Sequence, residues 1–243
     1  MNKIKLPVQA LSVAVLGLLF LSPSSWAQEK GLFFYGLQME ELEYRRGDEK
    51  ENLFNWNGDA FVGTDEIKLR WLGEAEYDRG ASKFESLENR LVLQMPISTF
   101  FDAKGGVRLD TPKGTDRWYG VLGITGLAPQ WFEVDADLFF SEAGEASARL
   151  DVEYELLITN RLILTPSADI NVAFSDDTEI GIKAGLTSVE AGLRLSYDLI
   201  DRAVSPYLGL VYERKLGNTA DLADGEGEDI EGWRAVIGTR IVF

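Results

Sequence analysis

Polar and apolar side chains alternate along nearly the whole chain, and this alternation limits what the chain can fold into. It runs from Leu32 to the final residue, Phe243, and is clear in segments such as WFEVDADLFF, ASARLDVEYELLI and TSVEAGLRLSYDL. A β-strand points successive side chains to opposite faces, so each segment would have one apolar and one charged face. A helix would mix the two sets of side chains. The alternation therefore predicts a chain built almost entirely of β-strands.

Twelve segments of the sequence show this pattern, and the connections between them are of two kinds. The segments cover residues 32–46, 51–62, 65–78, 84–95, 99–110, 115–127, 130–142, 146–158, 161–174, 187–199, 204–216 and 231–243. Every second connection is tight (GTD, PIS, APQ, TN, IDRAV), whereas the others are more charged and often longer, such as SDDTEIGIKAGL. Short links between consecutive strands favour antiparallel pairing. We expect an up-and-down sheet with one trimmed rim and one rim of loops.

An even number of strands with one apolar face each suits a β-barrel in a membrane. In lipid every backbone N–H and C=O must be bonded internally, so the sheet has to close on itself. About twelve residues at ~3.3 Å each, tilted by about 40°, span roughly the thickness of the apolar layer. Aromatic residues near the segment ends would form the interfacial girdles: Trp56, Tyr77, Trp118, Phe132, Tyr197, Trp233 and Phe243. A soluble barrel with the apolar face inside is the alternative, but a barrel much wider than eight strands cannot be filled by single side chains.

The predicted fold class is therefore all-β: a transmembrane up-and-down antiparallel β-barrel of about 12 strands, with a polar lumen, in the cell outer membrane. The segment 231–243 would close the ring by pairing with the first segment, which places Phe243 at the rim of tight turns.

The N-terminal residues have the pattern of a secretory signal peptide. Lys3 and Lys5 precede a mainly apolar run from Val8 to Leu21, and Ala27 ends a stretch with small residues at the two positions that a signal peptidase reads. A retained anchor helix needs about 20 apolar residues, more than this run contains. We predict a signal peptide over 1–27 and an outer-membrane β-barrel domain over 28–243.

The composition excludes several classes of chemistry. The chain has no histidine and no cysteine, which rules out Ser–His and Cys–His catalysis and imidazole or thiolate metal sites. We therefore predict that the chain is not an enzyme. Acidic residues outnumber basic ones, 40 to 24, and the formal net charge is −16. Such a chain repels nucleic acid and attracts cations, so no nucleic-acid partner is expected.

The charged faces of the segments would line the lumen, and two interpretations of them are open. They could form a salt-bridge network that stiffens the barrel, or they could form a charge-lined path for ions. The neighbouring segments 130–142 and 146–158 carry more carboxylates than the nearby Arg149 can pair with, so a cation could be drawn there. These candidate metal residues are Glu133, Asp135, Asp137, Asp151, Glu153 and Glu155.

A further acidic stretch, DLADGEGEDIEG, lies between the last two segments and contains no basic residue. It is interpreted as a solvated acidic loop, or alternatively as a weak trap for divalent cations bound to lipopolysaccharide. Its spacing does not match the Ca²⁺-binding loop of an EF-hand.

Several long stretches closely resemble the outer-membrane copper resistance protein B family. They include GLQMEELEYRRGDEKENLFNWNGDAFVGTDEIKLRWLGEAEYD, LENRLVLQMPISTFFDAKGGVRLD, GLAPQWFEVDADLFFSE and SYDLIDRAVSPYLGLVYERK, and the similarity runs from about Gly31 to Phe243. The resemblance implies an outer-membrane barrel of copper resistance that binds or passes copper beside periplasmic copper proteins of the same system. The alternating final segment with a terminal Phe243 also resembles the signal that the outer-membrane assembly machinery reads. Outer-membrane lipid and lipopolysaccharide are the other expected partners.

The sequence departs from the family in one respect. Members typically carry a Met- and His-rich periplasmic extension whose thioethers suit Cu(I), whereas here the predicted signal peptide leads almost directly into the first strand. Only Met39 and Met95 follow the predicted cleavage site. Two methionines far apart in sequence usually face lipid or pack, but the family resemblance of the QMEELEY stretch adds Met39 to the candidate metal residues. The alternative function is a general small-solute channel, or a structural barrel without specific copper handling.

Overall fold

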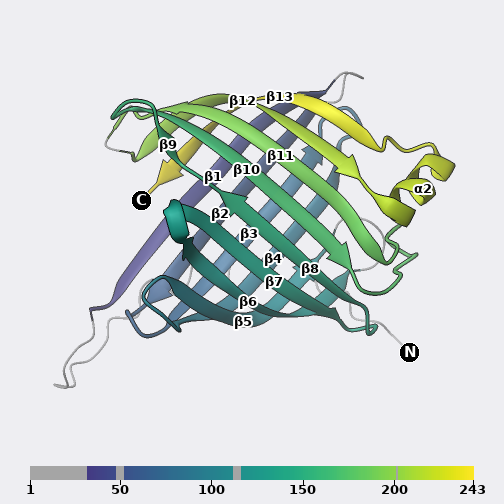
Figure 1. Ribbon diagram of the computed structural model, residues 1–243, viewed down its shortest axis with the longest axis horizontal. Coiled ribbons are helices and arrows are strands. Elements are labelled where there is room, and N and C mark those ends of the chain that lie inside the picture. Colours follow the sequence, from purple (N-terminus) through teal and green to yellow (C-terminus); the bar gives the residue numbers. More distant parts are fainter. Residues whose placement is uncertain (1–31, 48–51, 112–115, 201) are drawn as a thin grey trace. The chain divides into compact units, whose positions relative to one another are not determined.

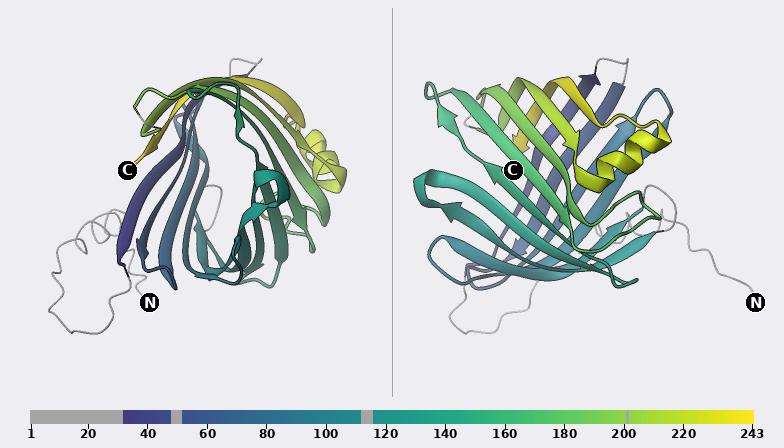
Figure 2. Two further views of the ribbon diagram at one scale, coloured as in Figure 1. Left: turned by 60° about the vertical axis from the view of Figure 1, so that its left-hand side comes forward. Right: turned by 45° about the vertical axis from the view of Figure 1, so that its right-hand side comes forward.

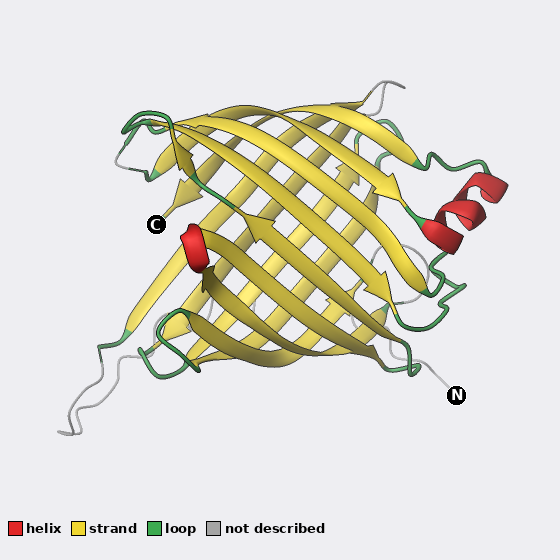
Figure 3. Ribbon diagram, viewed as in Figure 1, coloured by secondary structure: helices red, strands yellow, loops and turns green. Residues whose placement is uncertain are grey.

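The computed structural model describes residues 32–47, 52–111, 116–200 and 202–243, and the predicted signal peptide lies outside them. Its strands are β1 (Phe34–Gly47), β2 (Asn52–Gly63), β3 (Lys68–Asp78), β4 (Lys83–Pro96), β5 (Phe101–Asp110), β6 (Arg117–Ala128), β7 (Phe132–Ser141), β8 (Ala146–Glu153), β9 (Leu156–Leu157), β10 (Leu162–Ala173), β11 (Gly185–Tyr197), β12 (Val204–Lys215) and β13 (Glu231–Val242) (Figure 1). A 3₁₀ helix, η2 (Pro129–Trp131), and an α-helix, α2 (Gly217–Glu226), complete the described elements (Figure 3). Neither of these two helices is long and apolar enough to cross a membrane.

The strands form a closed antiparallel ring in which neighbours in the chain pair with each other, except that β8 and β9 both pair with β10 (Figure 2). The ring closes between β1 and β13, where the backbone N–H of Leu37 donates to the C=O of Phe243 at 3.1 Å and that of Phe243 donates to the C=O of Leu37 at 2.8 Å. This pairing joins the two ends of the sheet, so neither β1 nor β13 is left as an open edge. The predicted up-and-down barrel and the predicted pairing of the last strand with the first are confirmed.

The eighth predicted strand, 146–158, is interrupted, so the ring of twelve strands contains a broken one. β8 ends at Glu153 and only Leu156 and Leu157 resume the ladder, as β9, beside β10. Pro166 of β10 lies opposite the break, where the N–H of Tyr154 donates to the Pro166 C=O at 3.1 Å. Proline has no N–H to donate the second hydrogen bond of this antiparallel pair, so the ladder is interrupted at this point.

A β-bulge in β1 shifts which residues face the interior. The register with β2 changes between the pairs Met39↔Gly58 and Glu41↔Asn57, which leaves Glu40 as the extra residue. A bulge of this kind inverts the alternation beyond it. Glu40 and Glu41 consequently both line the interior cavity, and the buried side chains that follow them are Glu43 and Arg45.

The two faces of the barrel differ sharply in chemistry. Large apolar side chains are exposed on the outer face, for example Leu150 at 37% and Leu208 at 64%. Charged side chains on the inner face are buried, with Glu43 at 0% and Asp137 at 2% exposure. This distribution is the reverse of a soluble protein and suits a barrel whose exterior meets lipid.

Part of the interior is filled by an apolar cluster on β4, β6 and β7. Val92, Tyr119, Val121 and Phe139 are buried and pack together. The Arg108 guanidinium lies over two of these rings, 4.4 Å from the centroid of Phe139 and 5.0 Å from that of Tyr119. The open space inside the barrel is therefore displaced toward the other strands.

The connection between β12 and β13 begins with a helix rather than a loop, although the acidic side chains of the stretch DLADGEGEDIEG are exposed, as expected for a solvated segment. Residues Gly217–Glu226 form α2, which ends at Gly227 in the left-handed conformation with φ of 76°. The helix is fastened to the neighbouring connection by Thr219, whose hydroxyl accepts a hydrogen bond from the Lys183 N–H at 3.0 Å and donates one to the Lys183 C=O at 3.2 Å. Alternation and composition could not predict these contacts, because they join segments far apart in sequence.

Candidate functional site

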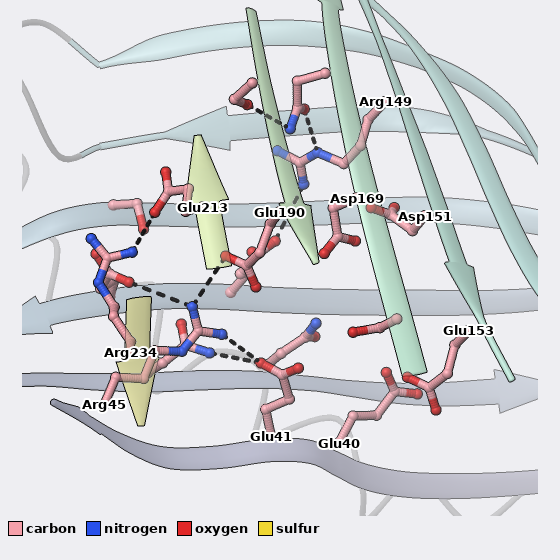
Figure 4. Close-up of a pocket in the computed structure, with 18 of the residues that line it drawn as sticks. Glu40, Glu41, Arg45, Arg149, Asp151, Glu153, Asp169, Glu190, Glu213 and Arg234 are labelled. Atoms are coloured by element: carbon pink, nitrogen blue, oxygen red, sulfur yellow. Dashed lines mark hydrogen bonds and ion pairs between the residues drawn. The ribbon is translucent and has the colours of Figure 1, made fainter. Parts of the chain in front are cut away.

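The candidate site is the cavity inside the barrel, which has a volume of about 1210 Å³. Within the described residues, sixteen Asp or Glu and nine Lys or Arg side chains line it (Figure 4). They come from β1, β3, β4, β7, β8 and β10 to β13, and from the rim that carries the longer connections. The lining therefore has an excess of seven formal negative charges, which favours cations over anions.

Five carboxylates form one continuous row across this wall. The cross-strand pairs Asp135↔Asp151, Asp151↔Asp169, Asp169↔Glu190 and Glu190↔Glu213 join β7, β8, β10, β11 and β12. We call this row the acidic ladder. Like charges directly opposite one another destabilise a sheet, so the ladder needs compensating positive charge.

Basic side chains compensate the ends of the acidic ladder but not its middle. Asp135 pairs with Lys104, Glu190 lies 3.3 Å from Arg45, and Glu213 lies 2.5 Å from Arg234. Asp151 and Asp169 have no ion-pair partner among the described residues. The centre of the ladder is thus the part of it that no basic side chain compensates.

The sequence suggests Arg149 as the basic partner of the neighbouring carboxylates, but in the structure it does not pair with them. Its guanidinium reaches across the interior to Glu74 at 3.2 Å and to Glu88 at 3.1 Å. On the same side, Asp137 accepts from Arg90 at 2.7 Å and from Lys104 at 2.9 Å. We call these residues, together with Arg108 and Asp135, the β3–β8 network.

A second set of ion pairs, the β1–β11 network, was missed by sequence reasoning. Arg194 binds Glu43 and Glu41, each at 2.6 Å, and Arg45 lies between Glu43 at 2.8 Å and Glu190 at 3.3 Å. The signal was present in QMEELEY, where the apolar positions change phase between Met39 and Leu42. That change marks the bulge and moves Glu41, Glu43 and Arg45 to the inner face.

The structure separates the seven candidate metal residues into four groups. Glu133, Asp151 and Glu153 line the cavity and have no ion pair among the described residues. Asp135 and Asp137 are held by Lys104, and Asp137 does not line the cavity. Glu155 lies in the break between β8 and β9 and lines a second, smaller cavity.

Met39 is not brought together with these carboxylates. It lines neither cavity and its sulfur lies where a Cβ on Gly58 would stand. Among the residues that the structure describes, no cluster of three or more acidic side chains is arranged to hold a metal ion. The carboxylate wall is therefore an electrostatic surface rather than a built coordination site.

Acidic groups on the rim of longer connections are stabilised in their charged form. Hydrogen bonds from the Ala184 N–H at 2.8 Å and from the Lys183 ammonium at 3.0 Å lower the pKa of Asp176. A hydrogen bond from the Ser141 hydroxyl lowers the pKa of Glu145. These carboxylates add negative charge to the rim of longer connections.

A closed antiparallel ring of twelve strands with an apolar exterior defines the class of outer-membrane β-barrels. The fold is similar to that of solved porins. A NanC porin matches with a TM-score of 0.53 and a KdgM porin with 0.51, each at 10% sequence identity, over 86% of this chain and 99% of theirs.

The sequence comparison is more specific than the fold. The family model for copper resistance protein B precursor (CopB) matches residues 33–243. Copper resistance protein B of Escherichia coli is 36% identical over 86% of this chain and 69% of its own length, and a homolog from Pseudomonas syringae pv. tomato is 32% identical over 84% and 68%. The chain belongs to the copper resistance protein B family, which confirms the resemblance seen in the sequence.

Proposed function

We propose that this chain is an outer-membrane barrel of copper resistance that passes copper cations through its interior. The observation that carries the proposal is the acidic ladder, whose central residues Asp151 and Asp169 face the cavity without a basic partner among the described residues. A row of opposed carboxylates costs stability, so its presence favours a role in attracting positive charge.

The donors in the cavity favour divalent copper. Carboxylate oxygens are hard ligands that suit Cu(II) and other divalent cations, whereas Cu(I) prefers thioethers and thiolates. Met95 is 49% exposed on the outer face, and Met39 lines neither cavity, so no thioether is offered along the described interior. Copper is the cargo in this proposal, attracted transiently rather than stored.

The membrane setting follows from the exterior of the barrel. Apolar side chains on the outer face would contact outer-membrane lipid, and the acidic long-connection rim would face lipopolysaccharide and its divalent cations. Insertion by the outer-membrane assembly machinery and cooperation with periplasmic copper proteins are part of the same proposal. With no histidine or cysteine in the sequence, we assign the chain no enzymatic activity.

One observation favours a second candidate, a structural barrel with a restricted lumen. Arg149 spans the interior from β8 to Glu74 on β3 and Glu88 on β4, and the apolar cluster fills the space beside it. Under this alternative the ion pairs serve only to stiffen the wall.

Copper survival and cellular copper content, measured with and without the chain, test the proposal. The decisive variant is Asp151→Asn/Asp169→Asn, which keeps the shape of both side chains and removes like-charge repulsion, so it should fold normally. We expect cells with this variant to show the same change in copper survival and copper content as cells that lack the chain. The matched control, Asp65→Asn/Glu66→Gln, removes two charges from an exposed turn and should behave as wild type. A double variant with an unchanged phenotype would favour the structural barrel.

A further inference from the structure

Arg240 of β13 stands at the boundary between two cavities. It lines the large cavity and also a second one of about 320 Å³, which is formed near the tight-turn rim by residues that include Gln38, Asp198 and Arg202. Ser196 is the only other residue lining both cavities among those described. A solute moving from one cavity to the other would pass the Arg240 guanidinium.

Four carboxylates act on this single guanidinium. Arg240 donates to Glu155 at 2.8 Å, and its other electrostatic partners are Glu40, Glu153 and Glu133. Figure 4 shows Glu40 and Glu153 pointing toward one another from β1 and β8. These carboxylates come from β1, β7, β8 and the break after β8, and they have few other partners. Glu155 is also 3.3 Å from Arg202, and Glu40 accepts from the Gln38 amide at 2.8 Å.

The broken strand explains how Glu155 reaches Arg240. Residues 154 and 155 lie between β8 and β9, opposite Pro166. On the other side, β7 begins at Phe132 and offers no strand partner to residues beyond Tyr154. With hydrogen bonds on one side only, this segment is free of the strict alternation of a strand, and its carboxylate turns into the smaller cavity.

We infer that Arg240 is a tethered counter-cation that determines which ions pass between the two cavities. This inference rests on the proposed passage of cations. The guanidinium binds Glu155 and lies within electrostatic range of Glu40, Glu133 and Glu153, where a passing cation would also be attracted. An entering ion must compete with it for these carboxylates. A divalent cation has twice the charge with which to compete, so the arrangement selects divalent over monovalent cations.

Ion selectivity of the purified full-length barrel in a planar lipid bilayer tests the inference. The reversal potential in a KCl gradient gives the K⁺/Cl⁻ permeability ratio. In Arg240→Gln we expect this ratio to rise by about threefold or more, because a unit charge a few ångströms from a permeating ion changes its local population by that order. Millimolar CuCl₂ should then reduce the K⁺ current more strongly in the variant, since the released carboxylates hold Cu(II) longer.

Three further variants make the result specific. Glu155→Gln should lower the permeability ratio, opposite in sign to Arg240→Gln, and Arg240→Lys should keep the wild-type ratio. Arg214→Gln makes the same chemical change at a 52% exposed rim side chain and should have no effect. If Arg240→Gln does not fold, the inference is judged on Glu155→Gln. An unchanged ratio in a conducting barrel would overturn the inference alone, whereas absence of current in the wild type would overturn the proposed passage as well.

Discussion

Replacing Asp137 by Asn should destabilise the barrel far more than the same change at Asp135, two residues away on the same strand. Asp137 is 2% exposed, and its Oδ2 accepts from Arg90 at 2.7 Å and from Lys104 at 2.9 Å. Removing one partner of a buried ion pair costs roughly 3–5 kcal/mol because the other charge is left without compensation. In the variant, Arg90 would still pair with Glu88 at 2.8 Å and Lys104 with Asp135. We therefore expect the free energy of unfolding to fall by about 3 kcal/mol, the lower end of that range.

Asp135→Asn provides the matched comparison for this prediction. Its side chain is 24% exposed in the cavity and Lys104 retains Asp137 after the change, so the loss should be at most about 1 kcal/mol, as for a solvated pair. Urea titration of the barrel in lipid, followed by tryptophan fluorescence, measures both free energies of unfolding. Equal losses in the two variants would show that the β3–β8 network is solvated throughout, and our account of it would be wrong.

Three other changes test the barrel itself. Leu150→Arg should destabilise by ~2–4 kcal/mol in a lipid unfolding titration because that side chain faces the bilayer, whereas Glu153→Gln on the inner face should be far milder; equal effects would mean that the strand register is inverted. Deleting Phe243 removes the two hydrogen bonds that join it to Leu37 at the end of the β1–β13 ladder and should reduce the heat-modifiable folded form in the outer membrane; normal assembly would contradict this. Pro166→Ala restores the missing donor opposite Tyr154 and should slow amide exchange at the break, and unchanged exchange would mean that the proline is not its cause.

Strict alternation was enough to predict the ring of strands, its antiparallel order and the residues that face lipid. Leu150 and Leu208 are exposed because the apolar phase of their segments runs unbroken, and the sheet has only one way to bury the other phase. Alternation did not predict the break between β8 and β9, which originates on another strand. Nothing within ASARLDVEYELLI signals a break, because its cause is a proline on β10.

The sequence could predict which residues line the candidate site but not which ion pairs they form. The sequence correctly places Glu133, Asp151 and Glu153 on the wall of the cavity. It could not show that Arg149 reaches across the interior, since such a partner is fixed by the diameter and stagger of the closed ring rather than by neighbours in the chain. Spacing alone also could not show that Asp137 is buried among basic side chains.

The apolar cluster on β4, β6 and β7 gives the two halves of this barrel different tolerance to change. Around Val92, Val121 and Phe139 the inner face is packed like the core of a water-soluble domain, so removing a methyl group there leaves a void. Along the acidic ladder the inner face borders open space, and side chains of new length or chemistry can be accommodated without repacking. The β4–β7 side is thus constrained by tight packing, whereas the wall that carries the acidic ladder can change in side-chain length and charge without repacking the interior.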